Sequence, residues 1–159
     1  MLGPIELTKT VLPVMIKQGQ GHQAITASVA GKVGGPLRTG YCAAKHAVMG
    51  FFDALRTEVA CRNIRITTIT PGFIRTNVSK NALTGDGSNA GEHDDDIRGG
   101  MDVNECAKVI MQGFESGTEE ITVGDGQEMG LLDSKRTDPT QAFRALEAMA
   151  DQIRSGGEA

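Results

Sequence analysis

The hydrophobic pattern alternates between stretches with helical spacing and short runs rich in β-branched residues. Residues 4–18 and 41–61 place apolar side chains three and four positions apart, which is typical of amphipathic helices. Residues 23–28 and 65–70 instead read as short buried strands, and residues 120–123 as a third. A strand, a helix and a second strand in this order predict parallel strands joined by a right-handed crossover. The sequence therefore predicts an α/β fold.

The rest of the chain is organised around one long polar segment. Residues 77–102 are rich in Asn, Gly, Ser and Asp, and a loop of this length in a compact domain is usually a functional lid or disordered. Asp102 and Glu105 then form a capping signal for the next helix. We interpret residues 125–136 as a connector and residues from Pro139 onward as a C-terminal amphipathic helix.

Three polar side chains in this frame form a candidate proton-transfer site. Tyr41 and Lys45 are four residues apart, so they share one face of a helix. A neighbouring cation favours the ionised form of a phenol, which suits it to acid–base chemistry near neutral pH. Ser28 ends the preceding strand and can hold a carbonyl or alcohol oxygen. Because open α/β sheets bind ligands at the carboxyl ends of their strands, we expect Ser28, Tyr41 and Pro71-Gly72 to meet at one edge.

Tyr41 or Lys45 alone would be an ordinary helix residue. The signal for a functional site is a set of residues with a fixed order and spacing. That set is Ser28, Tyr41 and Lys45 with twelve and three intervening residues, followed by Pro71-Gly72-Phe73-Ile74-Arg75-Thr76. The set resembles the short-chain dehydrogenases/reductases over most of residues 1–125. The resemblance implies a partial Rossmann-like parallel sheet with three recognisable strands and flanking helices. It also implies NAD(P)-dependent interconversion of an alcohol and a ketone or aldehyde.

The resemblance assigns roles to individual residues. Tyr41 is the general acid–base group, Lys45 assists it and binds the nicotinamide ribose, and Ser28 hydrogen-bonds the substrate oxygen. Thr76 contacts the nicotinamide carboxamide with help from the backbone near Ile74. The catalytic set is therefore Ser28, Tyr41 and Lys45, and the cofactor-binding set is Tyr41, Lys45, Pro71, Gly72, Ile74 and Thr76.

The resemblance also bears on substrate and assembly. In the family, the segment that matches residues 77–102 closes over a small-molecule carbonyl or alcohol. Residues 77–79 look like those of reductases that act on lipophilic carbonyls or alcohols. Family members commonly pair through the two helices that residues 4–18 and 41–61 resemble, so we expect a homo-oligomer, and a homodimer in the simplest case.

One part of the family pattern is missing from the sequence. The family begins with a strand and a glycine-rich turn that cradles the dinucleotide pyrophosphate at a helix N-terminus. The glycine-rich stretches 31–35 and 124–126 do not link a first strand to a helix in that order. We therefore expect residues 1–124 to be the C-terminal half of the family's domain, followed by the connector and helix of residues 125–159. Such a chain holds only the nicotinamide end of NAD or NADP.

Two hypotheses follow for a truncated chain. In the first, the protein is a reductase whose translation start lies further upstream, so that the site is incomplete in residues 1–159. In the second, the short chain is a non-catalytic relative that acts as an interaction or dimerisation partner. The second hypothesis predicts an exposed sheet edge beside residues 23–28, and such an edge invites pairing with another chain.

Composition disfavours several other functions. The net charge of −4 makes nucleic acid an unexpected partner, and no apolar run approaches the roughly 20 residues that span a bilayer. Three scattered cysteines suit reduced thiols and a cytoplasmic location. His93 with Asp94, Asp95 and Asp96 resembles a metal-ligand cluster. Because consecutive side chains do not converge on one ion without a turn, we interpret the run as a solvated acidic loop and expect no metal site.

Overall fold

The computed structural model describes residues 1–89, 91 and 95–156 of the 159-residue chain. The helices and strands are, in chain order, α1 (Leu2–Gln18), β1 (Gly21–Thr26), η1 (Val29–Gly31), α2 (Thr39–Val59), η2 (Ala60–Arg62), β2 (Ile64–Pro71), α3 (Asp95–Arg98), α4 (Val103–Ser116), β3 (Glu120–Val123), α5 (Gln127–Thr137) and α6 (Pro139–Gly156). The predicted α/β class is confirmed, since a parallel sheet of three strands is flanked by helices.

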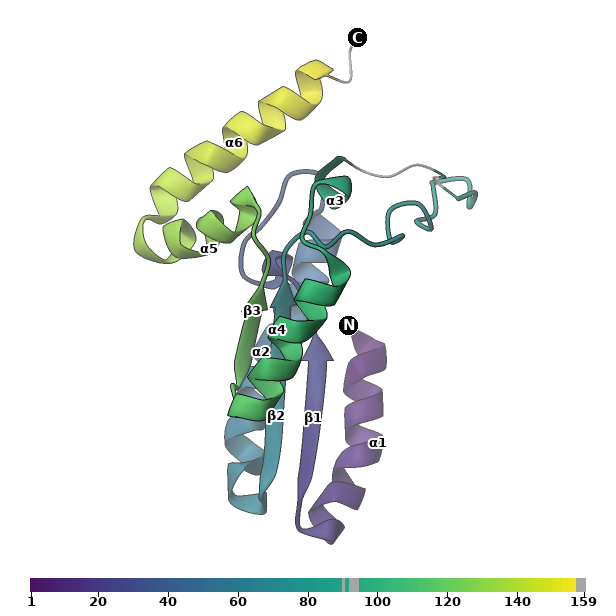
Figure 1. The fold of residues 1–159 in the computed structure, drawn as a ribbon, viewed down its shortest axis with the longest axis vertical. Coiled ribbons are helices and arrows are strands. Elements are labelled where there is room, and N and C mark those ends of the chain that lie inside the picture. Colours follow the sequence, from purple (N-terminus) through teal and green to yellow (C-terminus); the bar gives the residue numbers. More distant parts are fainter. Residues whose placement is uncertain (90, 92–94, 157–159) are drawn as a thin grey trace.

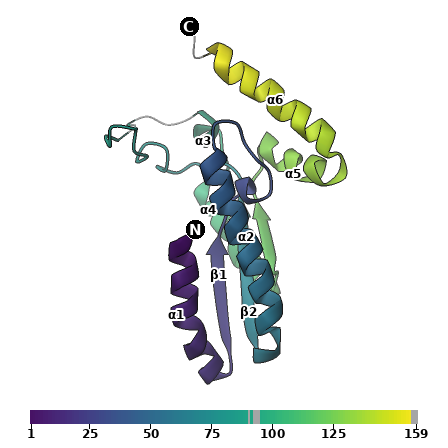
Figure 2. The same ribbon diagram turned by 180° about the vertical axis from the view of Figure 1, so that it is seen from behind.

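The three strands run parallel in the order β1-β2-β3. Thr26 lies opposite Ile69, and Pro71 lies opposite Val123, so the carboxyl ends of all three strands reach the same edge of the sheet. Helix α2 covers one face and α4 covers the other, as the two opposite views show (Figures 1 and 2). Helix α6 lies beyond the carboxyl edge (Figure 1).

Each face of the sheet has its own hydrophobic core. On the α2 face, where α1 also packs, the fully buried members are Ala27, Val48, Met49, Phe52, Leu55, Val59, Ile64 and Ile66. On the α4 face they are Ile69, Cys106, Ile121 and Val123. The central strand β2 contributes to both cores, which explains why almost every residue of its sequence is buried. A strand covered on both faces is expected to be a continuous β-branched run rather than an alternating one.

Local signals in the sequence fix several element boundaries. Gly19 ends α1 in the left-handed conformation, with φ 71°, which glycine adopts without steric cost. The predicted cap of α4 is confirmed, because Asp102 Oδ1 accepts the N–H of Asn104 at 2.9 Å. Glu105 does not complete a reciprocal capping box and instead pairs with Lys108.

The structure also differs from the sequence interpretation. Strand β1 ends at Thr26, so Ser28 follows the strand instead of ending it. Residues 127–137 form helix α5 where a connector was expected. The polar segment contains helix α3 and an antiparallel bridge between Leu83 and Asn89. All three cysteines are free, and among the described residues no helix combines the length and apolar character needed to span a bilayer.

His22 links β1 to both the neighbouring strand and α4. Its Nε2 lies 2.9 Å from Thr67 Oγ1, and its ring meets Phe114 edge to face with 5.5 Å between centroids. Thr67 Oγ1 itself donates to the carbonyl of Thr118 at 3.3 Å, so the imidazole is the donor in its contact with Thr67. Burial, and secondarily the charge of Arg65, lower the pKa of His22.

We expect this lowered pKa to make folding stability depend on pH. The stabilisation from neutral His22 is complete above the unfolded-state histidine pKa of about 6.5 and is lost as pH falls through the lower folded-state value. Urea unfolding followed by circular dichroism should therefore give a smaller free energy at about pH 5.5 than at about pH 7.5. The variant His22→Gln should reduce that difference, and an unchanged difference would contradict the assignment.

Candidate active site

Lys45 lies between Tyr41 and the end of β1. Tyr41 is in the first turn of α2, and its side chain is 48% exposed. One turn later, Lys45 Nζ is 5.6 Å from the centroid of the Tyr41 ring and donates to the carbonyl of Thr26 at 3.3 Å. No hydrogen bond from the described residues engages the Tyr41 hydroxyl. The phenol oxygen is therefore available to a ligand, with a cation beside its ring.

Ser28 is fixed by the short helix that follows it. Its backbone is extended, and its Oγ accepts the N–H of Ala30 at 3.1 Å. This contact uses a lone pair of the hydroxyl and leaves its proton for an outside acceptor. Gly31 brings this helix against α2, because a Cβ added at Gly31 would lie 3.0 Å from the carbonyl oxygen of Lys45. The absence of a side chain at Gly31 thus lets the turn of Ser28 approach the turn of Lys45.

The turn after β2 is anchored on the side of β3 and α5. Pro71 is the last residue of β2, and the N–H of Gly72 donates to the carbonyl of Val123 at 2.8 Å. The next N–H, that of Phe73, donates to Glu128 Oε1 at 2.9 Å. Glu128 is in the first turn of α5, so a helix 55 positions along the chain holds the residue that follows Gly72.

The same turn is also anchored by Met101. The N–H of Met101 donates to the carbonyl of Phe73 at 3.0 Å, and the N–H of Arg75 donates to the carbonyl of Met101 at 2.9 Å. These bonds pass on either side of Ile74, whose own N–H and carbonyl have no partner among the described residues. Ile74 therefore presents one backbone donor and one backbone acceptor beside the carboxyl edge of the sheet.

Thr76 belongs to a shallow depression at the start of the polar segment. Its Oγ1 accepts the N–H of Val78 at 3.3 Å, which is a local turn contact. The depression has a volume of about 440 Å³ and is lined by Arg75, Thr76, Asn77 and Val103. Within the described residues no hydrogen bond joins Thr76 to Ser28, Tyr41 or Lys45.

The two ends of the polar segment are tied together at this depression. Arg75 Nη2 lies 3.1 Å from Asp102 Oδ2. The N–H of Asn104, and secondarily the Arg75 guanidinium, hold the pKa of Asp102 below its ordinary value. Together with the Met101 bridge, this ion pair holds the two ends of the polar segment close to each other.

The sequence analysis named most of the residues described above, but it did not name Glu128. The structure places Lys45 beside Tyr41 and beside the strand end that precedes Ser28, with Pro71 and Gly72 at the end of the adjacent strand. Thr76 lies in the depression that Val103 of α4 also lines. Glu128 was not predicted, because its contact with Phe73 joins distant parts of the chain. The sequence around Glu128 resembles a connector.

The interpretation of the acidic run concerns residues that lie partly outside the described part of the chain. His93 and Asp94 are not among the described residues. Asp95 is in α3, where it pairs with Arg98 at 3.4 Å. Residues 1–89, 91 and 95–156 contain no group of three or more His, Cys, Asp or Glu side chains arranged to hold a metal ion.

Sequence comparison relates this chain to known dehydrogenases. The family model for short chain dehydrogenase matches residues 1–86. The chain is 38% identical over 148 residues to dehydrogenase/reductase SDR family member 7B of Xenopus laevis, covering 93% of this chain and 46% of that protein. It is 44% identical over 125 residues to dehydrogenase/reductase SDR family protein 7-like of Drosophila melanogaster, covering 79% and 38%. The chain thus spans less than half the length of these relatives.

Solved structures agree with this placement at the level of the fold. A short chain dehydrogenase from Burkholderia cenocepacia in complex with NADP superposes with a TM-score of 0.72 at 18% identity, covering 92% of this chain and 55% of that one. A short chain dehydrogenase/reductase from Burkholderia phymatum in complex with NAD gives 0.64 at 20% identity, covering 77% and 50%. The Rossmann-like sheet expected from the sequence is the one these proteins have. This chain belongs to the short-chain dehydrogenase family.

Proposed function

We propose that Ser28, Tyr41 and Lys45 form the proton-transfer site of an NAD(P)-dependent oxidoreductase that interconverts an alcohol and a ketone or aldehyde. The observation that carries this proposal is the position of Lys45, whose ammonium group contacts both the Tyr41 ring and the strand end before Ser28. The family and its relatives support the reaction class. The substrate is a small carbonyl or alcohol.

The residues at the carboxyl edge fit the nicotinamide end of the cofactor. A carboxamide needs one acceptor and one donor, and the unpaired carbonyl and N–H of Ile74 supply that pair. Lys45 uses one of its three N–H donors on Thr26 and keeps two for ribose hydroxyls. Thr76 and its neighbours line the adjacent depression. The described elements include no first strand with a glycine-rich turn for the pyrophosphate, so the proposal is limited to the nicotinamide end.

The mechanism assigns one proton-handling task to each side chain. A bound nicotinamide cofactor supplies or accepts the hydride at the substrate carbon. Tyr41 donates its phenol proton to the substrate oxygen during reduction and takes that proton back during oxidation. Lys45 holds its positive charge beside the Tyr41 ring and keeps N–H donors for the ribose hydroxyls. Ser28, whose Oγ lone pair is already used by Ala30, donates its proton in a hydrogen bond to the substrate oxygen and stabilises charge there.

The proposal divides the chain by role. We assign residues 1–124 to the C-terminal half of the family's dinucleotide-binding domain, with residues 77–102 as the substrate segment, and residues 125–159 to a C-terminal extension. In the relatives, which are more than twice the length of the matched region, further sequence is available for the pyrophosphate and adenine. That residues 1–159 lack the pyrophosphate-binding half stays a prediction.

Binding of cofactor fragments tests the proposal directly. Reduced nicotinamide mononucleotide should bind the chain saturably, as measured by nicotinamide fluorescence. It should also change the fluorescence of Tyr41, which is the only tyrosine in a chain without tryptophan. ADP-ribose should compete weakly. Strong competition by ADP-ribose would show that an adenine-end site exists, and no nicotinamide binding at millimolar concentrations would reject the proposed cofactor site.

A second candidate function rests on the free edge of β1. The described sheet leaves β1 with β2 as its one neighbour, so the backbone groups on its outer edge are unpaired apart from the carbonyl of Thr26. An unpaired strand edge favours association with another chain. A non-catalytic interaction or dimerisation partner would use this edge. Light scattering separates the candidates, because this function requires a concentration-dependent increase in mass together with no nicotinamide binding.

A further inference from the structure

Glu128 occupies a slot formed by two glycines. A Cβ added at Gly72 or at Gly126 would overlap the Glu128 carboxylate, so the side chain passes through space that both residues leave empty. The neighbouring Met129 fills a similar space, since a Cβ at Gly124 would lie 2.8 Å from its sulfur. The first turn of α5 is thus fitted closely to the turn after β2, even though α5 lies outside the residues that the family model matches.

The contact made by Glu128 in this slot is specific. Its Oε1 accepts the N–H of Phe73 at 2.9 Å, and Phe73 is the residue immediately before Ile74. No cation pairs with Glu128 among the described residues, so this N–H is its one hydrogen-bond donor there. A hydrogen bond from a neutral donor to a carboxylate is stronger than a bond between two neutral groups. This N–H belongs to the Gly72–Phe73 peptide, so the contact holds the peptide unit that precedes the one carrying the Ile74 N–H.

Two successive peptide units before Ile74 are anchored in this way. Glu128 holds the N–H of Phe73, and Met101 holds its carbonyl, so both polar groups of Phe73 are engaged. The two trans peptides around Ile74 each use their other polar group on Met101, so the N–H and carbonyl of Ile74 point away from Met101. Without the Glu128 anchor, the remaining backbone hydrogen bonds of the turn among the described residues are those to Met101 and the one from the Gly72 N–H to Val123.

We propose that Glu128 is a positioning residue for the nicotinamide end of the cofactor, acting through the backbone of Phe73 and Ile74. This inference rests on the proposed function, because it assigns the free backbone pair of Ile74 to the carboxamide. It adds a side chain of α5 to a site otherwise built from residues 28–76. The C-terminal extension then takes part in cofactor binding as well as in packing.

Two variants of Glu128 separate a positioning role from a purely structural one. Glu128→Ala removes the acceptor, and we expect the dissociation constant of reduced nicotinamide mononucleotide to rise about tenfold, which equals 1.4 kcal/mol. Glu128→Gln keeps a carbonyl acceptor at the same place and should restore most of the affinity. The matched control is Glu147→Ala, since Glu147 lies on α6 in an exposed ion pair with Arg144.

A measurement on the ligand-free protein provides an independent readout. Amide hydrogen exchange by NMR should become faster at Phe73 in Glu128→Ala. The N–H of Cys106, which donates to the backbone carbonyl of Asp102 at 2.9 Å, should exchange as in the wild type. Faster exchange with weakened binding, both rescued by glutamine, supports the proposal. Unchanged affinity in Glu128→Ala, or unchanged exchange at Phe73, overturns the role of Glu128. No binding by the wild-type protein would instead reject the proposed function on which the role depends.

Discussion

Replacing Tyr41 by phenylalanine is expected to lower turnover of a carbonyl substrate by about 10²- to 10⁴-fold, the usual contribution of a positioned general acid–base group. The change removes the phenol oxygen and leaves the ring beside Lys45. Without that oxygen, the substrate oxygen must take its proton from water while the hydride is transferred. The measurement is kcat from the absorbance of the reduced nicotinamide, in a preparation of the protein with measurable wild-type turnover.

The fold should tolerate this substitution. The Tyr41 side chain is 48% exposed, and its hydroxyl has no partner among the described residues, so its removal leaves no buried group unsatisfied. Thr57→Ala is a matched control, because Thr57 is on the same helix and its hydroxyl donates to the carbonyl of Ala54 at 2.8 Å, away from the site. Wild-type turnover in Tyr41→Phe would remove Tyr41 from the mechanism. Equal losses in both variants would indicate damage to α2.

Features set by neighbours in the sequence could be predicted. The proximity of Tyr41 and Lys45 follows from one helical turn, and the start of α4 follows from a single aspartate at its N-terminus. The parallel arrangement of β1 and β2 follows from the helix between them, since a strand-helix-strand unit has few alternatives. These predictions depend on interactions within a few residues or on a general rule of chain connectivity.

Features set by distant contacts could not be predicted. Helix α5 has few apolar residues and an internal Gly130, so its sequence alone resembles a connector. Its first turn instead packs on Gly124, which is close in the sequence, and on Gly72, which lies 56 positions before Glu128. The free backbone groups of Ile74 depend in the same way on Met101, 27 positions later. A single sequence gives no sign of such pairings, although three glycines near Glu128 are consistent with a close approach.

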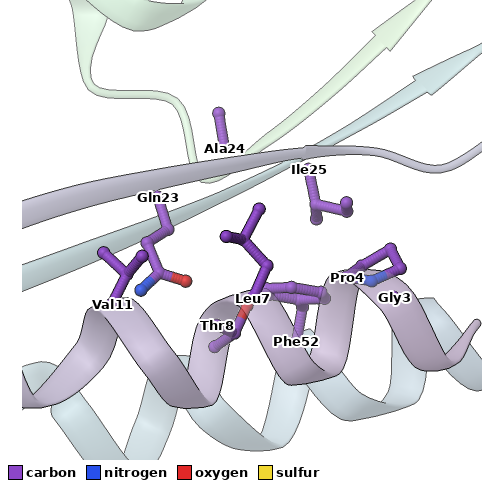
Figure 3. A pocket seen from close by; sticks show the side chains of 9 residues that line it. All are labelled: Gly3, Pro4, Leu7, Thr8, Val11, Gln23, Ala24, Ile25 and Phe52. Atoms are coloured by element: carbon purple, nitrogen blue, oxygen red, sulfur yellow. The ribbon is translucent and has the colours of Figure 1, made fainter.

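Replacing Phe52 by alanine is expected to lower the free energy of unfolding by about 3–5 kcal/mol. This is the largest loss of stability expected for any of the variants named above. Phe52 is 2% exposed and packs in the core that joins α1, α2 and the sheet. Figure 3 shows its ring behind α1, on the side of β1 toward which Ile25 points. An open groove of about 320 Å³ already borders this ring, so the deletion would enlarge an existing space. Urea unfolding followed by circular dichroism measures the loss.

The matched control for Phe52 is Phe143→Ala on α6. Phe143 is 48% exposed, and the Nζ of Lys135 lies 3.9 Å from the centroid of its ring. A cation–π contact at an exposed site contributes about 0.5–1 kcal/mol, so the control should cost several times less than Phe52→Ala. Because Phe52 anchors the helix that carries Lys45, its loss should also loosen the contact between Lys45 and Thr26. Equal costs for the two variants would mean that this core does not hold α2 against β1, and the candidate site would then lack its structural support.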